Sequence, residues 1–203
     1  GVYLTSPSVH GIEGNTYTLD IKLKSQIGGY SEYSASSMLS PVARLDSINL
    51  LFHPDWSSDG IWEVKCFVQD PSTIDFYRFL ISRNDTMITD TLDEWFVTDD
   101  RFFNGYYVNG ATVGYLDQRI KEERLIPGDT MLLEMNNIGE EYANFLWESQ
   151  SEIRGSYPLF SGPPSNVKGN INNGAIGFFA AYAASRAYAY VHPPKEVQFP
   201  HLH

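Results

Sequence analysis

Hydrophobic and polar residues alternate along several short stretches of this chain. Between residues 16 and 24, apolar side chains occupy every second position, which is typical of a strand with one buried face. Gly28 and Gly29 follow and predict a turn, and residues 30–39 are suited to be the antiparallel partner. Together with the residues expected before Gly1, these two strands predict a small β-sandwich.

The same two-residue period recurs further along the chain. Asn104-Gly105 and Asn109-Gly110 are dipeptides that favour tight hairpin turns, and residues 115–125 fit either a strand or a charged loop. The further strands that the pattern predicts are residues 47–53, 61–69, 76–83, 94–98, 130–136, 177–184 and 186–192.

Only one stretch has a convincing helical period. Residues 140–153 are predicted to form a helix that begins with Glu140 and Glu141, where the helix dipole favours negative charge, and that ends at Gly155. The face predicted to pack against the rest of the protein is Tyr142, Phe145, Leu146, Ser149 and Ile153.

These elements predict a mostly β fold, a β-sandwich or flattened barrel with one α-helix. The expected organisation has three parts. Residues 1–44 are the C-terminal part of a small β-domain, residues 45–192 the main β-rich domain, and residues 193–203 a proline-rich tail.

Composition narrows the class of function. The 203 residues carry 14 Lys and Arg against 25 Asp and Glu, a net charge of −11, which argues against nucleic-acid binding and against electrostatic docking on an anionic membrane. Hydrophobic residues make up 42% and aromatic residues 14%, enough for a real core. Charged residues are only 19%, a balance more typical of an extracellular β-protein than of a cytosolic helical enzyme. The apolar stretch 175–191 is interrupted by Ser185 and Arg186 and is too short to span a membrane.

The residues that bind metals and cofactors are sparse. Cys66 is the single cysteine, so no intramolecular disulfide forms, and its strand context predicts a buried small hydrophobe. His201 and His203, with His192 upstream, lie among prolines and are expected to belong to an exposed tail. No phosphate-binding, dinucleotide-binding or zinc-protease motif occurs, so we expect no metal and no cofactor.

Acidic residues offer one catalytic alternative. Glu94 with Asp99 or Asp100 is a candidate carboxylate pair for glycan hydrolysis, because glycosidases use two such groups a few ångströms apart. The simpler interpretation is turn chemistry, in which the carboxylates accept hydrogen bonds from the backbone.

Aromatic residues beside predicted turns are the candidate ligand-binding residues. A rigid aromatic surface suits sugars, peptides or protein partners, whereas the alternative is local packing under a long loop. The candidates are Trp56, Phe102, Phe103, Tyr106 and Tyr107.

Several phrases, in this order, resemble the "domain of unknown function 4249" family of Bacteroidota surface lipoproteins. They are Leu45-Asp46-Ser47-Ile48, Asp70-Pro71 followed by Phe76-Tyr77-Arg78-Phe79, Asp99-Asp100-Arg101-Phe102-Phe103-Asn104-Gly105, Pro127-Gly128-Asp129, and Pro163-Pro164-Ser165-Asn166-Val167 leading to Gly174-Ala175-Ile176-Gly177-Phe178-Phe179.

The resemblance implies a longer precursor with a lipidated cysteine and an N-terminal Ig-like or transthyretin-like β-domain, of which residues 1–44 are part. It implies a location at the outer-membrane surface of the cell envelope, where an outer-membrane receptor or another envelope protein is the partner and a glycan or peptide a possible ligand. It supplies no catalytic residues. We therefore expect a non-enzymatic module accessory to a TonB-dependent receptor, with a structural or adhesive module, or a glycan hydrolase, as the alternatives.

Overall fold

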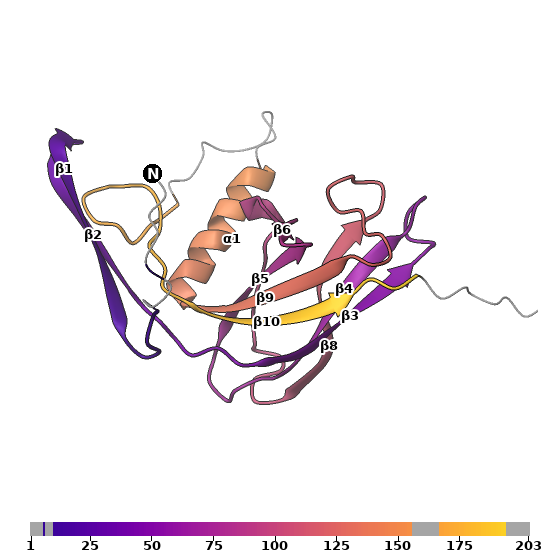
Figure 1. Cartoon of the computed structure of the whole chain (residues 1–203). Helices are drawn as coiled ribbons and strands as arrows, with labels where there is room; N and C mark the ends of the chain where they lie inside the picture. Colours follow the sequence, from indigo (N-terminus) through magenta and orange to yellow (C-terminus); the bar gives the residue numbers. More distant parts are fainter. Residues whose placement is uncertain (1–5, 7–9, 156–166, 194–203) are drawn as a thin grey trace, which may run out of the picture.

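The computed structural model of the chain describes Ser6, residues 10–155 and residues 167–193. The described residues form three antiparallel sheets and one α-helix (Figure 1). The two-stranded sheet is β1 (Thr16–Ile27) and β2 (Tyr30–Met38), and the three-stranded sheet has the order β3 (Leu45–His53), β4 (Ile61–Gln69), β8 (Tyr107–Asp117). The five-stranded sheet has the order β10 (Ala183–Tyr190), β9 (Thr130–Ile138), β5 (Phe76–Arg83), β6 (Thr86–Met87), with β7 (Phe96–Asp99) also paired to β5.

The three-stranded and five-stranded sheets pack face to face. Every second residue of β4 (Trp62, Val64, Cys66 and Val68) is buried between them, which explains the alternation in the sequence. The opposite sheet contributes aromatic and aliphatic side chains to the same core, including Tyr77, Phe79, Ile81, Met131, Leu133 and Met135. Burying a side chain of this size stabilises the fold by about 1.5–3 kcal/mol, so this interface dominates the stability of the sandwich.

The helix α1 (Glu140–Gly155) covers the outer face of the five-stranded sheet (Figure 1). Leu146 and Ala143 are completely buried there, and Trp147 donates its indole N–H to the Val97 carbonyl oxygen at 3.2 Å. Because both faces of β5 are covered, five consecutive residues of that strand, 77–81, are buried rather than every second one.

The two long sides of the sandwich differ. On one side β3 lies beside β10, and the Leu45 backbone N–H donates to Ser185 Oγ at 2.8 Å. On the other side β7 and β8 are both edge strands, and no ladder joins them in the described part of the chain. The sandwich is therefore closed along β3 and β10 and open between β7 and β8.

The hairpin β1–β2 projects from the sandwich and is held by a loop from late in the chain (Figure 1). The Ser34 backbone N–H donates to Asn172 Oδ1 at 2.8 Å, and the Asn170 and Asn173 side-chain amides donate to the carbonyl oxygens of Ser36 and Glu32. This asparagine-rich loop occupies part of the free edge of β2, where a further strand would otherwise pair.

Most predicted elements are confirmed. The hairpin turns at Gly28 and Gly29, which both have positive φ, and the mostly β fold with one helix is a sandwich with no sheet closed into a barrel among the described residues. The predicted helix is present and extends two residues further, although Ile153 is half-exposed and Gln150 is buried in its place. Gln150 Nε2 donates to the carbonyl oxygens of Leu92 and Trp95, so a polar contact anchors the end of the helix.

Two predictions about the strands are wrong. Asn109-Gly110 is not a turn but lies inside β8, where Gly110 has φ +85° and is skipped in the register with β4, so the dipeptide forms a β-bulge. The two strands predicted at 177–184 and 186–192 are a single strand, β10, which begins at Ala183, because the residues before it run beside β2 instead of entering the sheet. Ten of the eleven residues predicted as a proline-rich tail, and the Pro163-Pro164 motif, lie outside the described residues.

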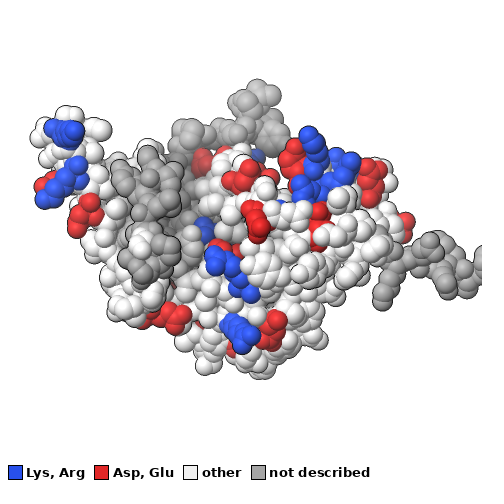
Figure 2. Space-filling view, in the orientation of Figure 1, with Lys and Arg blue, Asp and Glu red and all other residues white. Residues whose placement is uncertain are grey.

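Charged side chains of both signs are interspersed over the face shown in Figure 2, with uncharged areas between them. Within the described residues, α1 is neither long nor apolar enough to cross a membrane.

Candidate functional site

Two adjoining cavities lie between the sheets on the open side of the sandwich. Both are lined by β8 and share Phe79, Phe96 and Val113. The first, of about 230 Å³, lies along the C-terminal half of β8; its lining is mixed, and we call it the polar cavity because it contains charged side chains. The second, of about 170 Å³, lies along the N-terminal half of β8 and is apolar. We call the two together the inter-sheet site.

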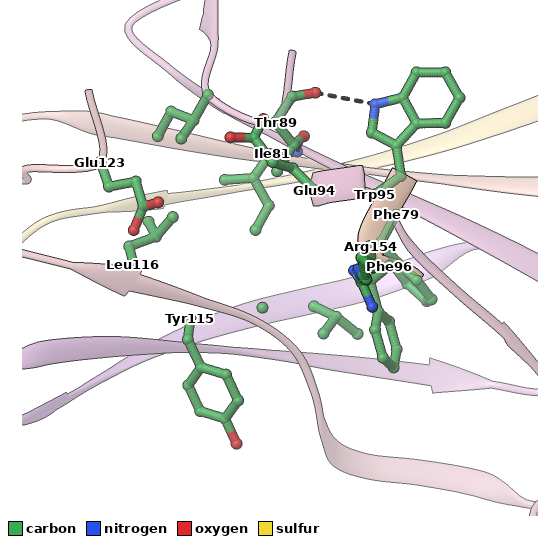
Figure 3. Close-up of a pocket in the computed structure, with 13 residues that line it drawn as sticks. Phe79, Ile81, Thr89, Glu94, Trp95, Phe96, Tyr115, Leu116, Glu123 and Arg154 are labelled. Atoms are coloured by element: carbon green, nitrogen blue, oxygen red, sulfur yellow. Dashed lines mark hydrogen bonds between the residues drawn. The ribbon is translucent and has the colours of Figure 1, made fainter. Parts of the chain in front are cut away.

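The polar cavity contains three charged side chains: Glu94 at the end of the 3-10 helix Leu92–Glu94, Glu123 in the loop between β8 and β9, and Arg154 of α1. Figure 3 shows Glu123 on one side and Phe96 and Arg154 on the other, with Thr89 and Glu94 between them. Phe96 and Tyr115, both partly exposed, belong to the two edge strands that line the opening. The Thr89 hydroxyl accepts a hydrogen bond from the Ile81 backbone N–H, which fixes this wall to β5.

Glu123 has an unfavourable electrostatic environment. Burial raises the pKa of its carboxyl above the ordinary value, and the nearby carboxylates of Asp117, Glu94 and Glu122 raise it further, against the effect of one hydrogen bond from the Asp117 backbone N–H. Among the described residues no ion pair to a cationic side chain is present for Glu94 or Glu123. A positively charged ligand group beside Glu123 would therefore relieve the repulsion from its neighbouring carboxylates.

The apolar cavity extends the site into the core. Its walls come from the inner faces of both sheets, and the Cys66 thiol, whose pKa burial raises to about 11, forms part of them. The cavity is lined by Cys66, Val68, Tyr77, Phe79, Phe96, Thr98, Phe103, Val108, Ala111, Thr112, Val113 and Met135. Such a surface accepts an aliphatic or aromatic group and excludes water.

The five aromatic residues predicted from the sequence do not form one patch. Phe103 is partly buried and lines the apolar cavity, whereas Phe102 is 96% exposed and Tyr106 and Tyr107 are also exposed. Trp56 belongs to the loop between β3 and β4, at the opposite end of β4 from the strand end that pairs with Tyr107. A nine-residue strand spans about 30 Å, so Trp56 lies far from the other four.

Trp56 belongs to an aromatic and acidic cluster on the solvent face of the three-stranded sheet. Its indole stacks on the His53 ring with 3.6 Å between centroids, and His53 Nε2 lies 2.8 Å from Glu63 Oε2. Burial acts to raise the pKa of Glu63, but hydrogen bonds from Thr112, His53 and Lys65 outweigh it and lower that pKa. This cluster meets the polar cavity at Tyr115, whose ring lies 5.8 Å from Trp56.

The structure also reveals a buried arginine that the sequence pattern did not single out. Arg78 donates from Nε and Nη2 to Asn136 Oδ1, and its guanidinium lies 4.6 Å from the ring centroids of both Trp95 and Tyr182. Nη1 donates to the Tyr142 hydroxyl at 3.2 Å. The sequence feature that could have pointed to Arg78 is its position in Phe76-Tyr77-Arg78-Phe79, where a cationic residue lies within an aromatic strand.

The carboxylates proposed for catalysis are separated. Glu94 lines the polar cavity, but Asp100 is completely buried elsewhere and Asp99 forms a 2.5 Å ion pair with Arg101. Glu123, which the sequence analysis did not pair with Glu94, accompanies Glu94 instead. No group of three or more metal-binding side chains is suitably placed within the described residues, which exclude His201 and His203.

Fold and site define a helix-backed β-sandwich with a cavity between its sheets. The chain belongs to the family described as "Domain of unknown function (DUF4249)", whose sequence model matches residues 1–187. Neither the curated proteins nor the solved structures contain a match to this chain.

Proposed function

We propose that this protein is a non-enzymatic cell-surface binding module that captures a ligand or an envelope partner in the inter-sheet site. The single observation that supports this most is the juxtaposition of a polar and an apolar cavity on the open side of the sandwich. Cavities with an apolar wall and a few convergent polar groups are the usual form of a binding site.

The resemblance of this chain to a family of surface lipoproteins supports a location at the outer membrane. A lipid anchor N-terminal to the residues described here would hold the protein there. An accessory role beside a TonB-dependent receptor follows from the same resemblance. A module that only spaces or attaches other domains has no need of such cavities, so a structural or adhesive role is the less favoured alternative.

A thermal-shift screen of sugars, peptides and cofactors with the variant Ala111→Leu tests the proposal. Ala111 lines the apolar cavity, so a larger side chain fills it. A ligand at one hundred times its Kd stabilises the folded state by about 2.7 kcal/mol, which raises the Tm of a protein of this size by roughly 5–10 °C. We expect this shift in the unmodified protein and in the exposed control Ala184→Leu, and its loss in Ala111→Leu.

A screen in which no ligand shifts the Tm, together with a pull-down from envelope extract that recovers no receptor, would refute the proposal. A shift that Ala111→Leu leaves unchanged would place binding outside the inter-sheet site.

A second candidate, glycan hydrolysis, is favoured by the presence of Glu94 and Glu123 in one cavity and by the raised pKa of Glu123, which burial and nearby carboxylates cause. Turnover of any oligosaccharide that is abolished in Glu123→Gln and retained in Glu122→Gln would establish it over simple binding.

A further inference from the structure

The edge strand β8 offers unpaired backbone groups at the opening of the inter-sheet site. Gln118 N donates to the Gly60 carbonyl oxygen in the ladder with β4, so the alternating pattern of antiparallel pairing turns the main-chain groups of Asp117 and Tyr115 the other way, toward the open side. Asp117 N accordingly donates to Glu123 Oε2 at 2.6 Å. The N–H and C=O of Tyr115 have no such partner among the described residues.

A carboxylate therefore already occupies the place that a neighbouring strand's carbonyl would take at Asp117. Next to it, the Tyr115 N–H and C=O remain to pair with an added main chain. Extended peptides use free strand edges of this kind, and their affinity comes from main-chain hydrogen bonds.

The side chains around this edge determine which peptide it suits. Glu94 and Glu123 both line the polar cavity, and neither forms an ion pair in the described chain, although Arg154 lines the same cavity. A lysine or arginine placed between the two carboxylates fits their charge. The apolar cavity adjoins it through Phe96 and Val113. In an extended peptide, residues two apart face the same side, so a basic residue and an apolar residue at that spacing match the two cavities.

We propose that the ligand of the inter-sheet site is an extended peptide segment that pairs with the free edge of β8 at Tyr115, places a lysine or arginine between Glu94 and Glu123, and inserts an apolar side chain two residues away into the apolar cavity. This inference rests on the proposed function and names its ligand class. The bulges of β8 on the N-terminal side of Gly114 confine the pairing to the last few residues of the strand.

Selection from a displayed library of random eight-residue peptides tests the proposal. We expect the selected peptides to carry a lysine or arginine two positions from an aliphatic or aromatic residue. Synthetic versions, measured by fluorescence anisotropy, should bind about tenfold more weakly to Glu123→Gln than to the unmodified protein. The variant Glu122→Gln makes the same change of charge one residue away, outside the cavity, and should bind normally.

A peptide whose backbone is N-methylated at the residue facing Tyr115 separates edge pairing from side-chain binding, because it lacks the N–H donor. We expect its affinity to fall at least tenfold. Selection without enrichment of basic residues, or full binding by the N-methylated peptide, would overturn the inference.

Dodecylamine, a cationic amphiphile without a peptide backbone, shows whether the peptide ligand alone is wrong or whether the inter-sheet site binds no ligand at all. If dodecylamine binds and Ala111→Leu abolishes its binding while no peptide is selected, the binding site stands and its peptide ligand is refuted. If neither binds, both are refuted.

Discussion

Three carboxylates lie buried beneath the loop that carries the exposed Phe102. Asp70 accepts hydrogen bonds from the Tyr77 hydroxyl and the Gly105 N–H, Asp75 accepts from the Thr73 hydroxyl and the Asn137 amide, and Asp100 Oδ2 accepts from the Asp75 N–H at 3.0 Å. Asp100 Oδ1 is buried without a hydrogen-bond partner in the described structure. Burial raises the pKa of Asp70 and of Asp100, and the neighbouring carboxylates raise both further.

A raised pKa gives these groups an unusual effect on stability. The folded protein holds their protons more tightly than the unfolded chain, so their contribution to stability is present at low pH and is lost as the pH rises through the folded-state pKa. We predict that Asp100→Asn raises the free energy of unfolding at pH 7 by about 1 kcal/mol, because it removes the buried charge and keeps the acceptor for Asp75.

Urea unfolding between pH 3.5 and pH 8 measures this effect. The advantage of Asp100→Asn should shrink toward the acidic end, where Asp100 is protonated. A variant less stable than the unmodified protein at every pH would contradict the assignment.

Arg78 depends on geometry as well as charge. We predict that Arg78→Lys destabilises the fold by about 2–3 kcal/mol, because an ammonium group cannot reproduce the two hydrogen bonds to Asn136 or the stacking on Trp95. Chemical denaturation measures the difference. The same substitution at Arg101, an exposed residue paired with Asp99, serves as the control and should change little. Equal effects at the two positions would refute a special role for the aromatic surroundings of Arg78.

At the scale of elements, β8 has two bulges, and one of them is at Gly110. Gly110 has φ +85°, and an added Cβ would lie 3.3 Å from the Phe67 ring. We predict that Gly110→Ala destabilises the protein by about 1–2 kcal/mol through backbone strain. Gly155→Ala, at the end of α1 with open space around it, is the matched control and should be neutral. Thermal melting of both variants tests this, and a neutral Gly110→Ala would mean that the bulge is not strained.

The strands were predictable where one face is more buried than the other, as in β1, because the difference in burial then imposes a two-residue period. Asn109-Gly110 was wrongly predicted to be a turn, because a glycine with positive φ occurs in β-bulges as well as in turns. Only the pairing with β4 decides between the two. The start of β10 was misplaced because residues 170–181 bond to β2, a contact 138 residues apart in the case of Asn172 and Ser34.

The candidate site was predictable only in part. Phe103 and Glu94 were singled out from the sequence, and both line the inter-sheet site. Glu123 and Tyr115 were not assigned to the site, because residues 115–125 fitted a strand or a charged loop equally well, and the role of both residues depends on β8 being an edge strand. Edge position is a property of sheet order, which local sequence does not encode.

At the scale of the whole molecule, the open side of the sandwich gives access to the core. Cys66 lies at the apolar cavity, and its pKa of about 11, raised by burial, leaves little thiolate at neutral pH. We predict that methyl methanethiosulfonate modifies it about a hundredfold more slowly than a free thiol at pH 7.

Mass spectrometry of timed samples measures this rate. A ligand in the apolar cavity should slow the reaction further, and unfolding in urea should restore the rate of a free thiol. Equal rates in the folded and unfolded protein would show that the cavity is open to solvent.

The hydrogen bonds between the asparagine-rich loop and β2 also have a consequence for the order in which the chain folds. A ribosome makes a polypeptide from its N-terminus, yet the partner of Ser34 is made 138 residues later. The edge of β2 in the first hairpin therefore stays unpaired until residue 172 has emerged. Association with a chaperone would protect this edge in the meantime, and the hairpin would dock late in folding.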